Sequence, residues 1–109
     1  MKDDKLYLIH IIECIEHIES YTENVDKETF LNTTLIQDAV IRNLQTMAES
    51  TQRLSERAKQ TQPEIDWHRI AGFRNVLVHG YLGVDLERIW NIVENEIPAL
   101  KKAVRAMME

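Results

Sequence analysis

Apolar residues recur at intervals of three and four along most of the chain, a spacing that predicts amphipathic helices. The first predicted helix covers residues 3–22, and a loop follows it. Asp26 can cap a short helical turn after that loop. Asn32 or Thr33 can then cap a long second helix that runs to about Lys59.

The second half of the chain predicts two further helices. Thr61 to Glu64 ends the long helix and opens the next one, because proline is well tolerated in a first helical turn. We expect that helix over residues 64–82, with Gly72 allowing close packing or a local break. Asp85 caps the last helix, which Pro98 kinks or divides. The chain is therefore predicted to be all-α, a single domain over 1–109 with four to five antiparallel helices in one bundle.

The apolar arc of the first predicted helix is wider than one packed face needs. One stripe suffices to fill a core, so the additional apolar residues suggest contact with another subunit. They are Leu6, Tyr7, Ile9 and Ile12.

Composition narrows the class of protein. The chain has 109 residues, of which 44% are hydrophobic and 28% charged, a balance typical of a folded globular domain. Its formal net charge of -5 argues against a general nucleic-acid binder, so any RNA site must be a local patch. Without a signal peptide or an apolar run of about 20 residues, we expect a cytoplasmic protein that does not enter the membrane.

Cysteine and histidine often act as nucleophiles or metal ligands, but their positions in this chain favour structural roles. The single cysteine, Cys14, lies among apolar helical positions, so a buried thiol is expected rather than a nucleophile. His10 and His17 are seven residues apart on one helix face, but a metal site needs further ligands. We predict no bound metal and no cofactor.

The stretch from Arg74 to Tyr81 contains an arginine, an asparagine, a histidine and a tyrosine within an otherwise apolar segment. With Arg74 set at zero on a helical wheel, the apolar residues centre near 260°, whereas Asn75 and His79 fall at roughly 100° and 140°. The polar side chains thus face away from the core. Val78 lies among them, which suggests a cleft or a subunit interface.

These residue types suit RNA cleavage without a metal. A neutral histidine can accept the proton of a ribose 2′-OH, and its protonated form can protonate the leaving 5′-oxygen. Arginine offers a fixed fork of donors to the phosphate. A two-fold dimer would bring two histidines to one cleft. An arginine on a solvated face and a histidine that caps a helix end would be the structural alternative.

The segment resembles the Arg-x4-His-x-Tyr signature of the HEPN superfamily, and specifically that of HepT-like toxins. The polar Asn75 directly after the arginine also fits. The similarity spans nearly the whole chain in order, although Ala48-Glu49-Ser50 stands where the family often has Gly-Glu-Ala. Further matching segments are Gln37 to Val40, Asn43-Leu44, Pro63 to Trp67, Ile89-Trp90 and Ile97 to Leu100.

The resemblance implies a dimeric, metal-independent ribonuclease that acts as the toxin of a toxin–antitoxin pair. Arg74 and His79 would be catalytic, and Asn75 would support them. The partner would be a minimal nucleotidyltransferase antitoxin of the MntA type, which silences such toxins by transferring AMP to the signature tyrosine, here Tyr81. Candidates for recruiting RNA are Arg42, Arg53, Arg57, Lys59 and Arg69.

Two other functions stay open at this point. The polar arc could instead bind a nucleotide or the transferase, which would make the chain a non-catalytic regulatory subunit. The wide apolar arc of the first helix could instead serve a purely structural helical dimer.

Overall fold

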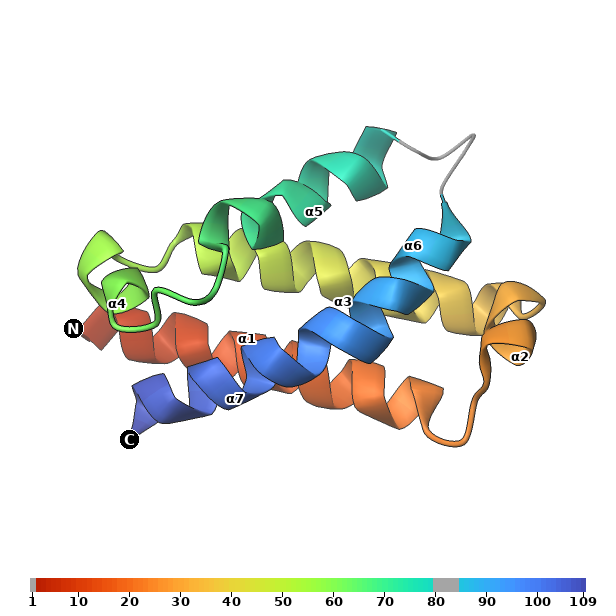
Figure 1. The fold of residues 1–109 in the computed structure, drawn as a ribbon, viewed down its shortest axis with the longest axis horizontal. Helices are drawn as coiled ribbons and strands as arrows, with labels where there is room; N and C mark the ends of the chain where they lie inside the picture. Colours follow the sequence, from red (N-terminus) through yellow and green to blue (C-terminus); the bar gives the residue numbers. More distant parts are fainter. Residues whose placement is uncertain (1, 80–84) are drawn as a thin grey trace.

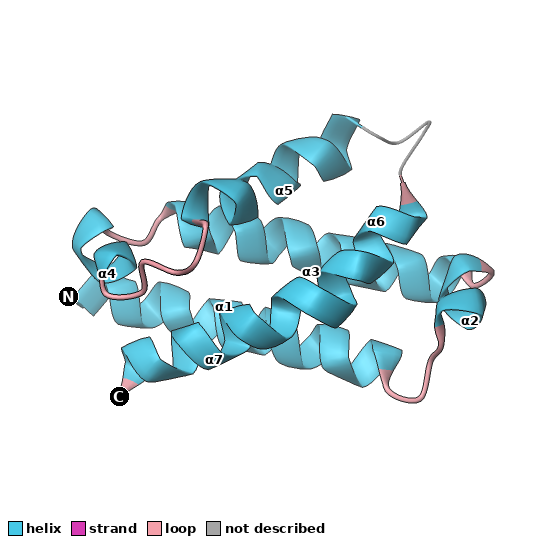
Figure 2. Ribbon diagram, in the orientation of Figure 1, coloured by secondary structure: helices cyan, strands magenta, loops and turns pink. Residues whose placement is uncertain are grey.

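The computed structural model describes residues 2–79 and 85–109, with side chains for residues 4–74 and 85–109. Within these residues the chain is helical and contains no strand, which confirms the all-α prediction (Figure 2). The elements in order are α1 (Lys2–Thr22), α2 (Lys27–Leu31), α3 (Thr34–Gln52), α4 (Glu56–Gln60), α5 (Trp67–His79), α6 (Leu86–Asn91), the π-helical segment η1 (Ile92–Glu96) and α7 (Ile97–Met108).

The long helices form an elongated bundle, with extents of 41 × 28 × 21 Å. Antiparallel α1 and α3 make its largest helix–helix contact, α5 packs on α3, and α7 packs on α1 (Figure 1). The two chain termini lie together at one end of the bundle. The C-terminal end of α5 and the start of α6 lie toward the other end, far from the termini.

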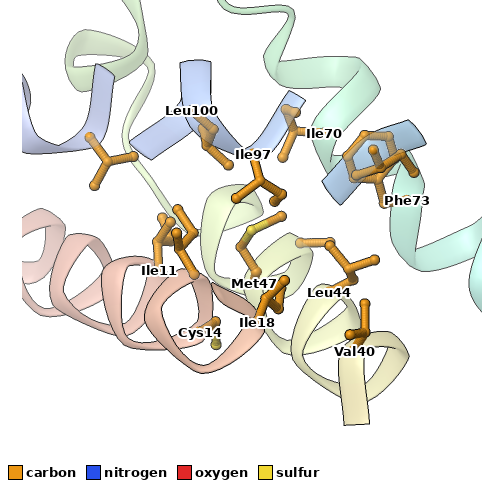
Figure 3. Packing of buried hydrophobic residues seen from close by; sticks show 14 of the residues in the cluster. Ile11, Cys14, Ile18, Val40, Leu44, Met47, Ile70, Phe73, Ile97 and Leu100 are labelled. Carbon is orange, nitrogen blue, oxygen red and sulfur yellow. The ribbon is translucent and has the colours of Figure 1, made fainter. Parts of the chain in front are cut away.

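The core is a single apolar cluster to which all four long helical segments contribute (Figure 3). Each fully buried large apolar side chain contributes about 1.5–3 kcal/mol relative to exposure. Cys14 belongs to this cluster and is 7% exposed, as predicted. Burial raises the pKa of its thiol, which makes a nucleophilic role unfavourable. Other labelled members include Ile11, Ile18, Val40, Leu44, Met47, Ile70, Phe73, Ile97 and Leu100.

Two of the predicted caps are confirmed. The carboxylate of Asp26 accepts a hydrogen bond from the Thr29 backbone N–H at 2.8 Å, at the start of α2. Asp85 accepts one from the Arg88 N–H at 3.1 Å, at the start of α6. Thr33 is the N-cap residue of α3, but its hydroxyl donates to the Thr29 carbonyl instead of capping the helix.

The predicted second helix is too long, because α3 ends at Gln52 and α4 is a separate helix. The helix is interrupted where Leu54 points into the core, and this side chain is 4% exposed. Ser55 then caps α4 by accepting a hydrogen bond from the Ala58 N–H. The carboxylate of Asp4 in α1 holds this break by accepting hydrogen bonds from the Ser55 N–H and hydroxyl, at 2.8 and 2.7 Å.

The predicted start of the third helix, near residue 64, is wrong by three residues. Pro63 and Glu64 lie in a turn, and α5 begins at Trp67. Asp66 is the better N-terminal residue, because its carboxylate accepts a hydrogen bond from the Arg69 N–H at 3.0 Å. The helix is unbroken at Gly72, and no atom of the described residues would contact a Cβ there, so these residues show neither role predicted for this glycine. The predicted helix end at residue 82 lies outside the described residues.

Pro98 divides the last predicted helix, which was one of the two expected outcomes. It lies in the first turn of α7, directly after the π-helical segment η1. Buried Ile92 and Ile97 are five residues apart, whereas a regular α-helix returns to the same face after three or four. The wider π turn absorbs the additional residue, so that α6 and α7 both keep their apolar side toward the core.

Part of the wide apolar arc of α1 packs against the core of its own chain. Tyr7 and Ile12 are half-buried and pack against the core cluster. Leu6 is 52% exposed, and Ile9 is half-buried. The apolar surface left for a second subunit on this helix is therefore smaller than the sequence pattern predicted.

Candidate functional site

One face of α5 is buried in the core, so the opposite face of this helix points to solvent. Ile70 and Phe73 are 5% and 1% exposed and join the core. Asp66 caps the first turn, while the Trp67 indole N–H donates to the carbonyls of Lys59 and Gln62 at 3.1 and 3.2 Å. These contacts set the rotation of the helix, and the part of the signature from Arg74 to His79 lies in its second half.

Arg74 is exposed on α5, as the helical wheel predicts. No ion pair joins it to an acidic side chain in the described part of the chain. Its guanidinium is therefore available to an anion from solution, and a phosphate oxygen is the anion that its fork of donors fits well.

Arg74 and His79 both belong to α5, which is α-helical at every residue between them. Over five residues a regular helix rises about 7.5 Å and turns to roughly 140° from the starting direction. A local distortion could bring the two residues side by side, but the helix between them is unbroken. A phosphate that reaches both residues must therefore lie across the arc that separates them.

Part of the predicted site lies outside the described residues. Asn75 and His79 have described backbone positions within α5, so their register is known, but their side chains are not among those described. Tyr81, the predicted modification site, lies outside the described residues altogether. The roles assigned to these three residues stay predictions.

The candidates for recruiting RNA divide into two groups. Arg69 makes a bidentate ion pair with Glu96 of η1, with nitrogen–oxygen distances of 2.8 and 2.9 Å, and Glu96 raises its pKa. Lys59 lies 3.7 Å from Glu56 and is mostly buried. Arg42, Arg53 and Arg57 are exposed. The pairing of Arg69 was not visible in the sequence, since its partner is 27 residues away.

Both histidines of α1 contact other side chains of the protein. His17 hydrogen-bonds the Asn43 side-chain oxygen at 3.2 Å and stacks on Tyr21. His10 is exposed beside Tyr7. Among the described residues no three His, Cys, Asp or Glu side chains are grouped as metal ligands would be. Nor does any described helix have the length and apolar character to cross a membrane.

Comparison with known proteins assigns the family. The family model described as "Ribonuclease HepT-like" matches residues 11–107, which is nearly all of the chain and includes the whole signature segment. The chain belongs to the HepT-like ribonuclease family. The resemblance inferred from the signature is thereby confirmed at the level of the family, and the all-α bundle agrees with it.

Several curated relatives of this HepT-like chain carry names of the same kind. "Probable ribonuclease HepT" of Thermococcus cleftensis is 39% identical over 100 residues, covering 92% of this chain and 91% of its own. "Putative RNase MJ1380" of Methanocaldococcus jannaschii is 32% identical over 103 residues, covering 94% of each chain. No solved structure gives a significant match.

A third relative is longer. "Gamma-glutamylcyclotransferase and putative RNase MJ0434", also of Methanocaldococcus jannaschii, is 38% identical over 108 residues. The match covers 99% of this HepT-like chain but 49% of the relative, so the chain spans about half of that protein's length.

Proposed function

We propose that this chain is a ribonuclease that cleaves RNA through Arg74 and His79 without a metal. Family membership and relatives named as ribonucleases support the class of reaction. The observation that carries the site is the exposure of Arg74 on the solvent side of α5, without an acidic partner among the described residues.

The proposed reaction transfers the phosphate within the RNA. The ribose 2′-oxygen attacks the adjacent phosphorus, the bond from phosphorus to the 5′-oxygen breaks, and a 2′,3′-cyclic phosphate forms. His79 takes the proton of the 2′-OH, or in its protonated form gives one to the departing 5′-oxygen. Arg74 binds the phosphate and stabilises the charge that grows on it, and Asn75 supports the two.

One histidine in each chain cannot be acid and base in the same step. We therefore propose that the working unit is a homodimer, in which a second copy supplies the other histidine. The separation of Arg74 and His79 on α5, at roughly 140° around the helix, also favours a phosphate held between elements rather than on one side of α5.

We further propose that the chain is the toxin of a toxin–antitoxin pair. Its partner would be a minimal nucleotidyltransferase of the MntA type, and this antitoxin would silence it by attaching AMP to Tyr81. The modification would place a phosphodiester charge two residues from His79, where the RNA phosphate must bind, and the two charges would repel.

The first experiment incubates the purified protein with total RNA in excess EDTA, after its mass has been checked. We expect the parent to cleave RNA, and Arg74→Ala and His79→Ala to lose the activity by about 100-fold or more. His10→Ala is the matched control, because it removes an exposed histidine on α1 and should cleave like the parent.

Cleavage that persists in His79→Ala would refute the proposed mechanism. An unmodified, folded parent that binds a nucleotide but never cleaves RNA would support the alternative, a non-catalytic regulatory subunit. A mass increase of one adenylyl group on Tyr81 would show that the antitoxin had already acted, and removing it should then restore cleavage.

A further inference from the structure

A surface hollow lies beside the first turns of α5. It has a volume of about 540 Å³. Trp67, His68 and Ala71 of α5 form one wall, and the turn after α4 contributes Ile65. His68 is exposed, and Trp67 is half-buried. His68 carries no sequence signal of its own, because a lone histidine near a helix start has no distinguishing pattern.

The hollow and the signature share one arc of α5. With Arg74 at zero, Trp67, Ala71 and His68 fall at roughly 20°, 60° and 120°, all within the arc from Arg74 to His79. Trp67 lies seven residues before Arg74, or about 10 Å along the helix. A strand of RNA whose phosphate is bound between Arg74 and His79 can therefore reach the hollow within a few nucleotides.

Gly72 lies in the turn of α5 between Ala71 of the hollow and Arg74. It has no side chain, and no atom of the described residues lies within 4 Å of where its Cβ would be. The helix therefore has no bulky group at this position, and a nucleic-acid strand can pass close to the backbone there.

The wall formed by Trp67 is held in place. Its indole N–H donates to two backbone carbonyls, so the ring needs no partner from solvent. Such a fixed, half-exposed ring can stack on a planar ligand without losing much side-chain freedom. The imidazole of His68, on the same wall, is a second aromatic plane.

The polar groups of the hollow favour a base over a phosphate. Gln52 and Gln60 contribute side-chain amides, which can donate to and accept from the edge of a nucleobase. The hollow also contains Glu56, and the one Lys among its lining residues, Lys59, lies 3.7 Å from that carboxylate. Because Glu56 balances the charge of Lys59, this pair offers a phosphate no net positive charge, whereas a neutral base does not need one.

We propose that this hollow is a nucleobase subsite, which binds one base of the RNA a few nucleotides from the phosphate at Arg74 and His79. The proposal rests on the proposed ribonuclease function. Stacking on Trp67 and His68 provides affinity, and the two glutamines contact the base edge. Substrate selection would then depend partly on a residue outside the cleaved linkage.

The kinetic test compares His68→Ala and Gln60→Ala with the parent on a mixed-sequence dodecaribonucleotide. Loss of one stacking partner corresponds to about a tenfold change in affinity or more. We expect His68→Ala to raise KM about tenfold and to leave kcat within about twofold. His10→Ala, an exposed histidine away from the hollow, should change neither. An unchanged KM in both hollow variants would overturn the subsite.

The binding test does not depend on cleavage. The chain has two tryptophans, and Trp90 is buried in the core, so quenching of fluorescence by bound bases would report chiefly on Trp67. In the His79→Ala background, polyuridylate and polyadenylate should quench the fluorescence. The quenching should disappear in Trp67→Phe and require about tenfold more RNA in His68→Ala.

The outcomes separate the two proposals. Quenching by RNA that depends on His68, with no cleavage by the parent, would refute the ribonuclease while supporting the base subsite. Cleavage with no quenching and no effect of His68→Ala would support the ribonuclease and overturn the subsite. Absence of both RNA binding and cleavage would overturn both.

Discussion

At the scale of single residues, Asp4 shows how one carboxylate can set the path of a distant segment. It is 7% exposed, and both its oxygens accept hydrogen bonds from Ser55, which is 51 residues further along the chain. These bonds, first that from the Ser55 backbone N–H, lower the pKa of Asp4. The ionised carboxylate thereby stabilises the break between α3 and α4.

We predict that Asp4→Ala lowers the free energy of unfolding by about 2 kcal/mol, since it removes two hydrogen bonds to a charged group. Because the folded-state pKa lies below the ordinary value of 3.8, this stabilisation is present above that pH and is lost as the pH falls through the folded-state pKa. Urea unfolding of parent and variant should therefore differ at pH 7 and converge under strongly acidic conditions.

Asp38→Ala is the control for that measurement, because Asp38 is exposed on α3. Its effect should stay within about 0.5 kcal/mol of the parent. A difference for Asp4→Ala that is equally large at pH 7 and in strong acid would contradict the role assigned to the ionised carboxylate.

At the scale of elements, the bidentate pair between Arg69 and Glu96 joins α5 to η1. The exposed fractions of the two side chains are 50% and 21%, so solvent screens the pair in part. We predict a small favourable coupling in a double-mutant cycle of Arg69→Ala and Glu96→Ala, which decreases as salt is added. Chemical unfolding at low and high ionic strength measures it.

The same pairing predicts that Arg69→Ala changes RNA affinity less than Arg74→Ala does, because the guanidinium of Arg69 is already bound to a carboxylate. Arg42→Ala, which removes an exposed and less constrained arginine of α3, serves as the comparison. A larger loss of RNA binding in Arg69→Ala than in Arg74→Ala would contradict this assignment.

The elements show which parts of the fold follow from local pattern. The helix centres could be predicted because burial repeats every three or four residues, and Asp26 and Asp85 cap locally. The break at Ser55 could not, because it depends on Asp4, which is remote in sequence. The π turn could not be predicted either, because Ile89, Val93 and Ile97 keep the ordinary helical interval of four residues in the sequence.

The candidate site likewise has features that the sequence predicted and features that it could not predict. Helical periodicity predicted that Arg74 faces away from the core, and it is exposed. The pairing of Arg69 with Glu96 and the hollow beside Trp67 join segments from different elements, so no local spacing reveals them. Sequence alone thus predicted that Arg74 lies on the exposed face of α5. It did not show that Arg69 pairs with a carboxylate whereas Arg74 has no such partner among the described residues.

At the scale of the whole molecule, the formal net charge of -5 limits how RNA can bind. An acidic protein gains little from long-range attraction, so affinity must come from a few phosphate contacts together with base stacking. For single strands, the logarithm of the binding constant falls with that of the salt concentration, by about 0.7 for each neutralised phosphate. We predict a slope shallower than about -3 for the proposed dimer.

Arg74→Ala should make that slope shallower by about 0.7 for each arginine that binds a phosphate, whereas His68→Ala should weaken binding without changing the slope, because a stacking contact releases no counterion. Fluorescence anisotropy with labelled RNA, in the His79→Ala background at several salt concentrations, measures both effects. A steep slope that Arg74→Ala leaves unchanged would mean that other cations bind the phosphates. The exposed Arg42, Arg53 and Arg57 would then be the residues to substitute next.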